Sequence, residues 1–141
     1  MDAIHYPLLD DADATEIPDP PEYAAFKVGG GDAGRKVTTL EVRGKELLWP
    51  SPAYSWFLYT MEDGDRGTFL AVIFSCMQVY VRGRNLRPVA AAVKRHRCSA
   101  LWEYNPDRWP LPADKSAPFI ASIRVQLPAH SQEAIAAAVA E

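Results

Sequence analysis

Residues 68–82 read TFLAVIFSCMQVYVR and contain the longest apolar run of the chain, residues 69–81. This run is too short for a membrane-spanning helix, which needs roughly 18 or more apolar residues. It is rich in β-branched and aromatic side chains, which favour strands. Because both of its faces are apolar, we expect residues 68–82 to form one central strand that is covered on both sides.

The stretch that follows, residues 83–97, reads GRNLRPVAAAVKRHR and carries the signature of an amphipathic helix. Its larger apolar residues recur at the spacing of one helix face, namely at Leu86, Val89, Ala90 and Val93. Asn85 is suited to the N-cap and Pro88 to the first turn. We expect the helix to end near Arg97, with basic residues in its last turn.

On either side of this region the sequence predicts further strands. Alternating or aromatic-rich segments favour strands at residues 37–42, 46–49 and 53–60, and an Asp-Gly turn leads from the last of these into the central strand. Two more strands are expected at residues 98–104 and 119–127, with a proline-rich loop between them at residues 105–118. In the last strand the residues expected to face inward are Phe119, Ala121, Ile123, Val125 and Leu127.

This order of elements predicts an α+β fold within a single domain, which suits a chain of 141 residues. We expect a mostly antiparallel sheet of about five to six strands with one amphipathic helix packed on a face. We also expect a short C-terminal helix and a flexible acidic N-terminal arm. The expected parts are an acidic, Pro/Gly-rich arm and linker at residues 1–34, a core domain at 35–128 and an alanine-rich helix at 129–141.

The net charge of −3 conceals an uneven distribution. Residues 1–34 hold eight acidic residues and one basic residue, whereas the rest of the chain holds ten acidic and fourteen basic residues. Three prolines and the glycine-rich stretch at 29–34 predict an arm whose apolar segments, 4–9 and 23–28, become ordered only when something binds them. The arm is expected to be a solubilising tail or, alternatively, a mask for basic residues of the body.

The basic residues are concentrated between Arg66 and Glu103, where the sequence contains no acidic residue. A glycine turn that leads into a helix N-terminus presents backbone N–H groups to anions, and guanidinium groups pair with phosphate or carboxylate. The candidate anion-binding residues are Arg82, Gly83, Arg84, Arg87, Lys94, Arg95 and Arg97. The favoured alternative is a basic, solvated helix face, because runs of charge are common on helix surfaces.

Aromatic residues supply two further candidates. Large aromatic side chains dominate protein interfaces, so the candidate interface residues are Trp109 and Leu111 in the long loop and Trp56. Trp109 is equally well explained as a core residue. A pocket for a ligand or substrate is the second candidate, with a desolvated carboxyl group on Glu103. Its expected lining is Tyr54, Trp56, Trp102, Glu103 and Tyr104.

The sequence carries no recognised catalytic, metal-binding or cofactor motif, so we assign no catalytic residue, no metal site and no cofactor. Its acidic start differs from the basic start of a signal peptide. We therefore expect a small cytoplasmic binding or assembly protein that acts through protein–protein contacts or self-association, away from membranes and without catalysis of its own. The alternatives are an anion or nucleic-acid binder that uses residues 82–97 and a small enzyme or ligand binder with the aromatic pocket.

Overall fold

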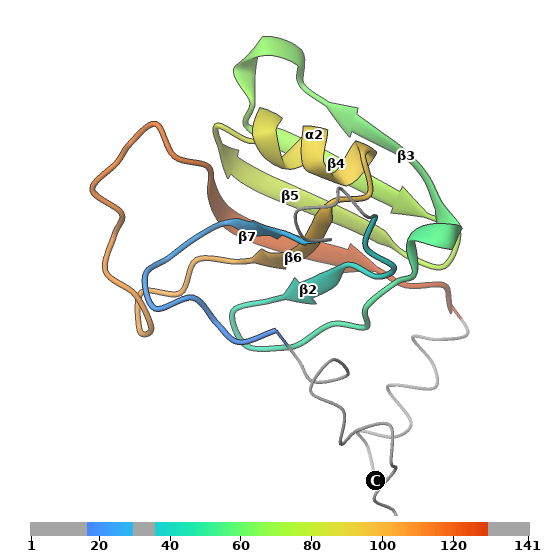
Figure 1. The fold of residues 1–141 in the computed structure, drawn as a ribbon, viewed down its shortest axis with the longest axis horizontal. Helices are drawn as coiled ribbons and strands as arrows, with labels where there is room; N and C mark the ends of the chain where they lie inside the picture. The colour runs from blue at the N-terminus through green and yellow to red at the C-terminus, as the bar shows by residue number, and fades with distance from the viewer. Residues whose placement is uncertain (1–16, 30–35, 130–141) are drawn as a thin grey trace, which may run out of the picture.

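A computed structural model describes residues 17–29 and 36–129 of the chain. This part forms a mixed α+β fold with two sheets and one helix (Figure 1). The α+β class agrees with the sequence, but the strands are divided between two sheets and do not form a single one. The predicted C-terminal helix at residues 129–141 and the apolar segment at 4–9 lie outside the described residues.

The larger sheet has four strands in the order β3-β4-β5-β7, and every neighbouring pair is antiparallel. Its strands are β3 (Phe57–Glu62), β4 (Phe69–Phe74), β5 (Gln78–Arg84) and β7 (Phe119–Gln126). The chain enters β3 through a short 3-10 helix at Tyr54–Trp56. β4 and β5 therefore have neighbours on both edges, whereas β3 and β7 are the outer strands.

The prediction of one long strand at residues 68–82 is wrong. The run folds back on itself, because a turn that includes exposed Ser75 and Cys76 separates β4 from β5. The N–H of Phe74 donates to the carbonyl of Met77 at 2.9 Å and closes this turn. Because β4 is apolar on both faces, its sequence shows no alternation that would stop at the turn. The turn is therefore hard to predict from the sequence pattern. The expected burial on both faces is confirmed for β4, in which every residue after Phe69 is buried.

The smaller sheet has three strands in the order β1-β6-β2. Its strands are β1 (Phe26–Val28), β6 (Cys98–Trp102) and β2 (Glu41–Arg43). β1 is antiparallel to β6 and β2 is parallel to it. Over both sheets of the described chain, four of the five strand pairs are antiparallel, so antiparallel pairs predominate as predicted. The segment predicted as a strand at 46–49 contributes only an isolated bridge between Leu48 and Arg43.

β1 lies within the stretch for which the sequence predicts a flexible arm. The structure instead places it in a sheet, because β6 is buried along its whole length and takes a strand on each edge. Ala25, just before β1, is 3% exposed and belongs to the hydrophobic core. The ordered body therefore includes residues 17–29, and the prediction that residues 23–28 need a bound partner to become ordered is wrong.

The helix α2 (Arg87–Lys94) lies across the larger sheet in Figure 1 and contacts β3 and β6. Its first turn contains Pro88, as predicted. The predicted N-cap is wrong: Leu86 occupies that position. Asn85 has a φ of 55° and donates hydrogen bonds to the carbonyls of the loop at residues 115 and 117. The helix also ends earlier than predicted, at Lys94, and His96 follows with a φ of 58°.

The inward face of β7 differs from the predicted alternation. Ile120 and Ile123 are buried, whereas Ala121 is exposed. The cause is an irregularity in the pairing with β5: Gly83 lies opposite Ile120 and Arg82 lies opposite Ser122, so Ala121 is an extra residue. Because one residue is inserted, the side chains before and after it no longer follow a single alternation between the two faces of the sheet. A strict period-two pattern in the sequence does not anticipate this.

Among the residues that the structure describes, no helix has both the length and the apolar character needed to span a membrane. The loop at residues 105–118 contains no helix or strand, as predicted.

Candidate functional site

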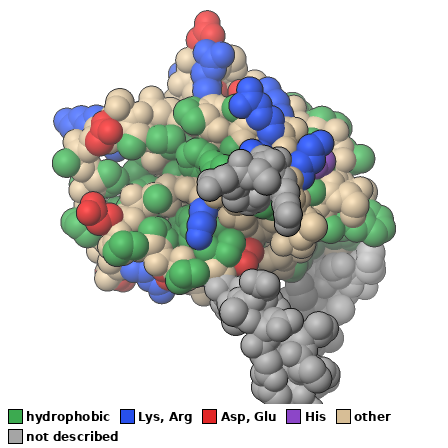
Figure 2. Space-filling view, in the orientation of Figure 1, with side chains coloured by type: hydrophobic (Ala, Val, Ile, Leu, Met, Phe, Trp, Pro, Cys, Tyr) green, Lys and Arg blue, Asp and Glu red, His purple; other side chains and the backbone are tan. Residues whose placement is uncertain are grey.

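The predicted anion-binding residues do not converge on one place. Arg87 pairs with Asp65 at 3.4 Å and Lys94 pairs with Glu62 at 2.7 Å, so two of the basic groups face acids of the β3–β4 hairpin. The Nε of Arg97 donates to the carbonyl of Gly29 at 3.0 Å, beyond the other end of the helix. In Figure 2 the Lys and Arg side chains lie at several separate places on the face shown.

The remaining basic residues of this group have other surroundings. The guanidinium of Arg82 lies 5.0 Å from the ring centre of Phe69, and that of Arg84 lies 4.5 Å from the ring centre of Phe119. A Cβ added at Gly83 would lie 1.8 Å from the carbonyl oxygen of Phe119, so this glycine allows two strands to approach closely. Its role in the structure is packing between β5 and β7. Arg95 is exposed at the end of α2.

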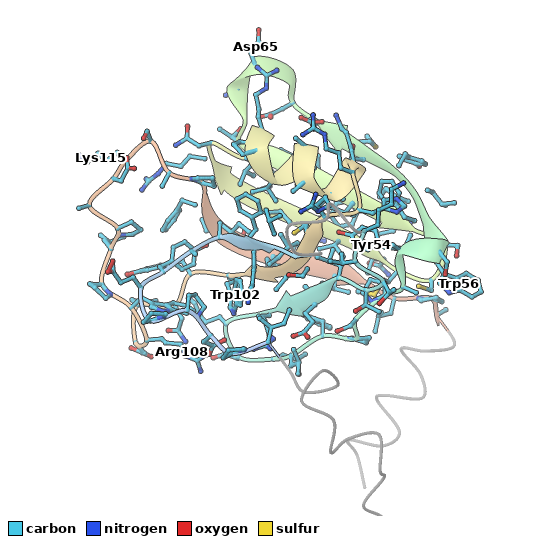
Figure 3. The ribbon with its side chains drawn as sticks, in the orientation of Figure 1. Tyr54, Trp56, Asp65, Trp102, Arg108 and Lys115 are labelled. Atoms are coloured by element: carbon cyan, nitrogen blue, oxygen red, sulfur yellow. The ribbon has the colours of Figure 1, made fainter. Side chains whose placement is uncertain are left out.

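The predicted aromatic pocket is not assembled. Tyr54 is buried, donates its hydroxyl proton to the carbonyl of Cys98 at 2.6 Å and stacks on His96 with ring centres 4.7 Å apart. Trp56 is 55% exposed. Trp102 lies at the other end of β6, and Figure 3 shows it well away from both Tyr54 and Trp56.

The Glu103 carboxylate is held by hydrogen bonds from two backbone N–H groups. One of its carboxylate oxygens accepts the N–H of Lys45 at 2.6 Å, and the other accepts the N–H of Ile123 at 3.1 Å. The residue thus connects the turn after β2 to β7. The ring of Tyr104 packs against Tyr23 and Phe119. These contacts account for both residues without a substrate.

The three predicted interface residues differ in their exposure to solvent. Trp109 is 4% exposed and packs with Ala100 and Trp102, so it is a core residue, covered in this structure by the segment at residues 17–21. Leu111 is 70% exposed. Trp56, which is also exposed, precedes the outer strand β3. The interface role of these last two residues stays a prediction.

The outer edge of β3, named the β3 edge from here on, combines an unpaired strand edge with exposed apolar side chains in the described part of the chain. β3 pairs with β4 on one side, and no strand of the described chain pairs with its other side. The exposed large side chains on or just before it are Trp56, Leu58, Tyr59 and Met61, each more than half exposed. Tyr59 and Met61 lie opposite Ile73 and Ala71. These two residues of β4 alternate with Leu70, Val72 and Phe74, which belong to the main core cluster, so Tyr59 and Met61 lie on the other face of the sheet.

A cleft that the sequence analysis did not anticipate is the second site. It is centred on Asp19 and formed by Arg43, Trp102, Arg108 and Trp109, and we name it the Asp19 cleft. One oxygen of the Asp19 carboxylate accepts hydrogen bonds from Arg43 at 3.1 Å and from the indole of Trp102 at 2.8 Å. The other oxygen pairs with Arg108.

Further hydrogen bonds hold the same segment to the cleft. The indole of Trp109 donates to the carbonyl of Pro20 at 2.8 Å, and Arg43 donates to the carbonyl of Ile17. A second carboxylate, that of Glu41, accepts from Arg43 at 2.6 Å and fixes its guanidinium. Beside Asp19 the cleft opens into a cavity of about 240 Å³.

The described part of the arm thus contacts arginines at two places: the Asp19 carboxylate meets Arg43 and Arg108, and the carbonyl of Gly29 accepts a hydrogen bond from Arg97. Asp19 is 24 residues from Arg43 and 89 residues from Arg108. The sequence signal was the rigid stretch Pro18-Asp19-Pro20-Pro21, a polar residue within prolines that hold the chain extended. Within residues 17–29 and 36–129, no three side chains of His, Cys, Asp or Glu gather into a group suited to a metal ion.

Comparison of the chain with protein-family models, with curated proteins and with solved structures finds no match.

Proposed function

We propose that this is a small binding and assembly protein that acts through protein–protein contacts, and that its β3 edge pairs with the β3 edge of a second copy. The observation that carries the proposal is the unpaired strand edge flanked by apolar side chains that are more than half exposed. An exposed apolar edge strand offers both backbone hydrogen-bonding groups and apolar surface to another chain. Natural proteins usually protect such an edge, so an unprotected one favours a partner.

The opposite edge of the same sheet is protected in this way. On β7, the N–H of Ile120 donates to the hydroxyl of Tyr23 at 2.9 Å, and its carbonyl accepts the N–H of Tyr104 at 2.9 Å. The N–H of Ile123 donates to Glu103. The contrast between a capped β7 and an open β3 supports β3 as the edge that takes a partner strand.

A second copy suits this edge because pairing of β3 with itself is isologous, with the same groups contributed from both sides. Antiparallel pairing would join two four-stranded sheets into one continuous sheet. It would also place Tyr59 and Met61 of one copy beside the same residues of the other, so that apolar side chains cover each other. No charged residue occurs in β3 before Glu62, so like charges would not oppose the pairing at its centre.

Sedimentation equilibrium of the full chain over a range of concentrations tests the proposal. We expect the mean mass to rise from 15.6 kDa towards twice that value as the concentration increases. Met61→Lys places a charge at the edge and should keep the chain monomeric. The control is Leu47→Lys, which also introduces a lysine at a half-exposed apolar residue but lies outside β3. A monomer at every concentration, or a dimer unaffected by Met61→Lys, would overturn the proposal.

A second candidate function, the binding of single-stranded nucleic acid, is favoured by the outward face of the larger sheet. Phe69, Tyr80, Arg82 and Arg124 border a shallow hollow of about 290 Å³ on this face. Aromatic rings that stack on bases, together with arginines that meet phosphates, are the usual means of binding single strands. Of the predicted anion-binding residues, Arg82 alone lines this hollow.

Binding of a labelled single-stranded oligonucleotide, measured at several salt concentrations, tests this second candidate. We expect the affinity to fall as salt increases and to be reduced at least about tenfold by Arg124→Glu. Arg95→Glu is the matched control, because it makes the same charge change at an exposed arginine away from this face. Equal effects of the two substitutions, or binding that does not depend on salt, would count against this function.

A further inference from the structure

Residues 17–21 lie in the Asp19 cleft in the way that a bound peptide lies in its receptor. Side-chain donors of the body meet the Asp19 carboxylate and the carbonyls of Ile17 and Pro20. Pro18 and Pro21 are exposed, and the segment has no helix or strand of its own. The segment is therefore held mainly by polar contacts to its backbone and to one carboxylate.

The prolines give this segment the properties of a good extended ligand. Each proline fixes its own φ and favours an extended conformation in the residue before it, so Asp19, which precedes Pro20, loses little freedom on binding. Grooves lined by aromatic residues commonly bind such preformed extended segments. Trp102 and Trp109 supply the aromatic walls here, and each uses its indole N–H to bind the segment.

The cleft is larger than the segment that lies in it. The cavity of about 240 Å³ continues past Asp19 along Lys45, Leu47 and Asn105, and Asp19 is the only residue of the segment that lines it. Leu47 is 52% exposed there. A longer ligand thus has both a site for a carboxylate and additional polar and apolar wall to contact.

We propose that the Asp19 cleft is a binding site for an extended, proline-flanked acidic segment of a partner protein, and that residues 17–21 occupy it in cis until such a segment displaces them. Charge complementarity supports this class of ligand, because Arg43 and Arg108 converge on a single carboxylate. Arg43 is also held in position by Glu41, so its guanidinium is preorganised. The site involves neither strand β3 nor a second copy, so it is independent of the dimer proposed above.

Calorimetric titration with a synthetic peptide of residues 15–23, TEIPDPPEY, tests the proposal on the full chain. The variant Asp19→Asn removes the charge of the cis segment and should bind the peptide. The wild-type chain should bind it at least about tenfold more weakly, because its own segment competes at an effective concentration of the order of mM. The same peptide with asparagine in place of its aspartate should bind neither chain. Asp107→Asn is the matched control on the neighbouring loop and should behave as the wild type.

Two further variants make the test independent of how well Asp19→Asn folds. Pro18→Gly combined with Pro21→Gly alters two exposed residues, loosens the cis segment without removing a contact, and should bind the peptide several-fold more tightly than the wild type. Arg108→Ala, added to either variant, should weaken binding about tenfold. Equal affinity of the wild-type chain and the loosened variants, or of the aspartate and asparagine peptides, would overturn the proposal. Sedimentation of the same variants reports separately on the dimer.

Discussion

The hydroxyl of Tyr23 accepts the N–H of Ile120 at 2.9 Å, although the two residues are 97 positions apart in the sequence. The same hydroxyl donates to the carbonyl of Trp102 at 2.7 Å, so one side chain joins β6 of the smaller sheet to β7 of the larger. Burial raises the pKa of Tyr23 above its ordinary value, which keeps the hydroxyl protonated and able to donate. Tyr23 therefore links the two sheets from a segment that the sequence assigned to a flexible arm.

Replacing Tyr23 by phenylalanine should lower the free energy of unfolding by about 1–3 kcal/mol. The ring and its edge-on contacts with Tyr104 and Trp109 would remain, but the N–H of Ile120 and the carbonyl of Trp102 would lose their shared partner. Urea unfolding followed by circular dichroism measures the change. Tyr59→Phe, at a half-exposed tyrosine, is the control and should shift stability by less than about 0.5 kcal/mol. Similar losses in both variants would contradict the role of the Tyr23 hydroxyl.

Local periodicity predicted the elements whose faces differ clearly. The apolar spacing around Val89 and Val93 predicted α2, and the alternating stretch near the C-terminal end of the body predicted β7. The turn between β4 and β5 was missed because β4 is apolar on both faces, so its sequence has no alternation that the turn could interrupt. The single-residue irregularity opposite Gly83 was missed because it is set by pairing between two strands, which no local pattern contains.

The candidate sites were harder to predict because their residues meet across long separations. The basic residues of segment 82–97 are neighbours in sequence, yet the strand, turn and helix direct them to different places. Conversely, Asp19 and Trp102 are 83 residues apart and in direct contact. Composition revealed an acidic arm and a basic body, but only the fold shows which acid meets which arginine.

The two cysteines should react very differently with thiol reagents. Cys76 is exposed in the turn between β4 and β5, whereas Cys98 is buried in β6, where burial raises its pKa to about 12. Titration of the native chain with a thiol-specific reagent near neutral pH should label Cys76 alone, and denaturant should release the second thiol. The variant Cys76→Ser should show no rapid labelling. Rapid reaction of both thiols in the native protein would contradict the burial of Cys98.

The same burial predicts a loss of stability in alkali. The pKa of Cys98 is raised above its ordinary value of 9.0, so its contribution is fully present below about pH 9 and declines as the pH rises towards 12. Urea unfolding at a series of alkaline pH values measures the decline. Cys98→Ala should make the decline shallower than in the wild type. An identical pH dependence in the two proteins would show that the thiol does not contribute.

The stabilising effect of Asp63 should be lost in acid, whereas that of Cys98 is lost in alkali. Its carboxylate accepts the hydroxyl and the N–H of Thr68, and the hydrogen bond from the hydroxyl holds the pKa of Asp63 below its ordinary value. The contribution is present above the ordinary pKa of 3.8 and is lost as the pH falls through the lowered value. Thr68→Val should therefore destabilise the chain near neutral pH, and the difference from the wild type should shrink below about pH 4.

Unfolding midpoints measured from neutral pH to about pH 2 check this dependence on Asp63. The matched control is Thr38→Val, the same change at an exposed threonine whose hydroxyl contacts no carboxylate among the described hydrogen bonds. Any effect of that control should be independent of pH. A difference between Thr68→Val and the wild type that stays constant across the whole range would contradict the link between Thr68 and Asp63.

The sequence predicts Gly83 in a turn before α2, whereas the structure places it within β5, and a substitution there distinguishes a role in binding from a role in packing. A methyl group at this position would overlap the backbone of Phe119, so Gly83→Ala should force β5 and β7 apart and cost at least about 3 kcal/mol of stability. The matched control is Gly64→Ala, where no atom lies within 4 Å of the added methyl group and the positive φ alone should cost about 1 kcal/mol. Because Arg82 and Arg84 are unchanged in Gly83→Ala, a folded, fully stable variant that had lost only anion binding would support the sequence-based assignment of Gly83. A large loss of stability identifies this glycine as the point where the close approach of two strands requires the absence of a side chain.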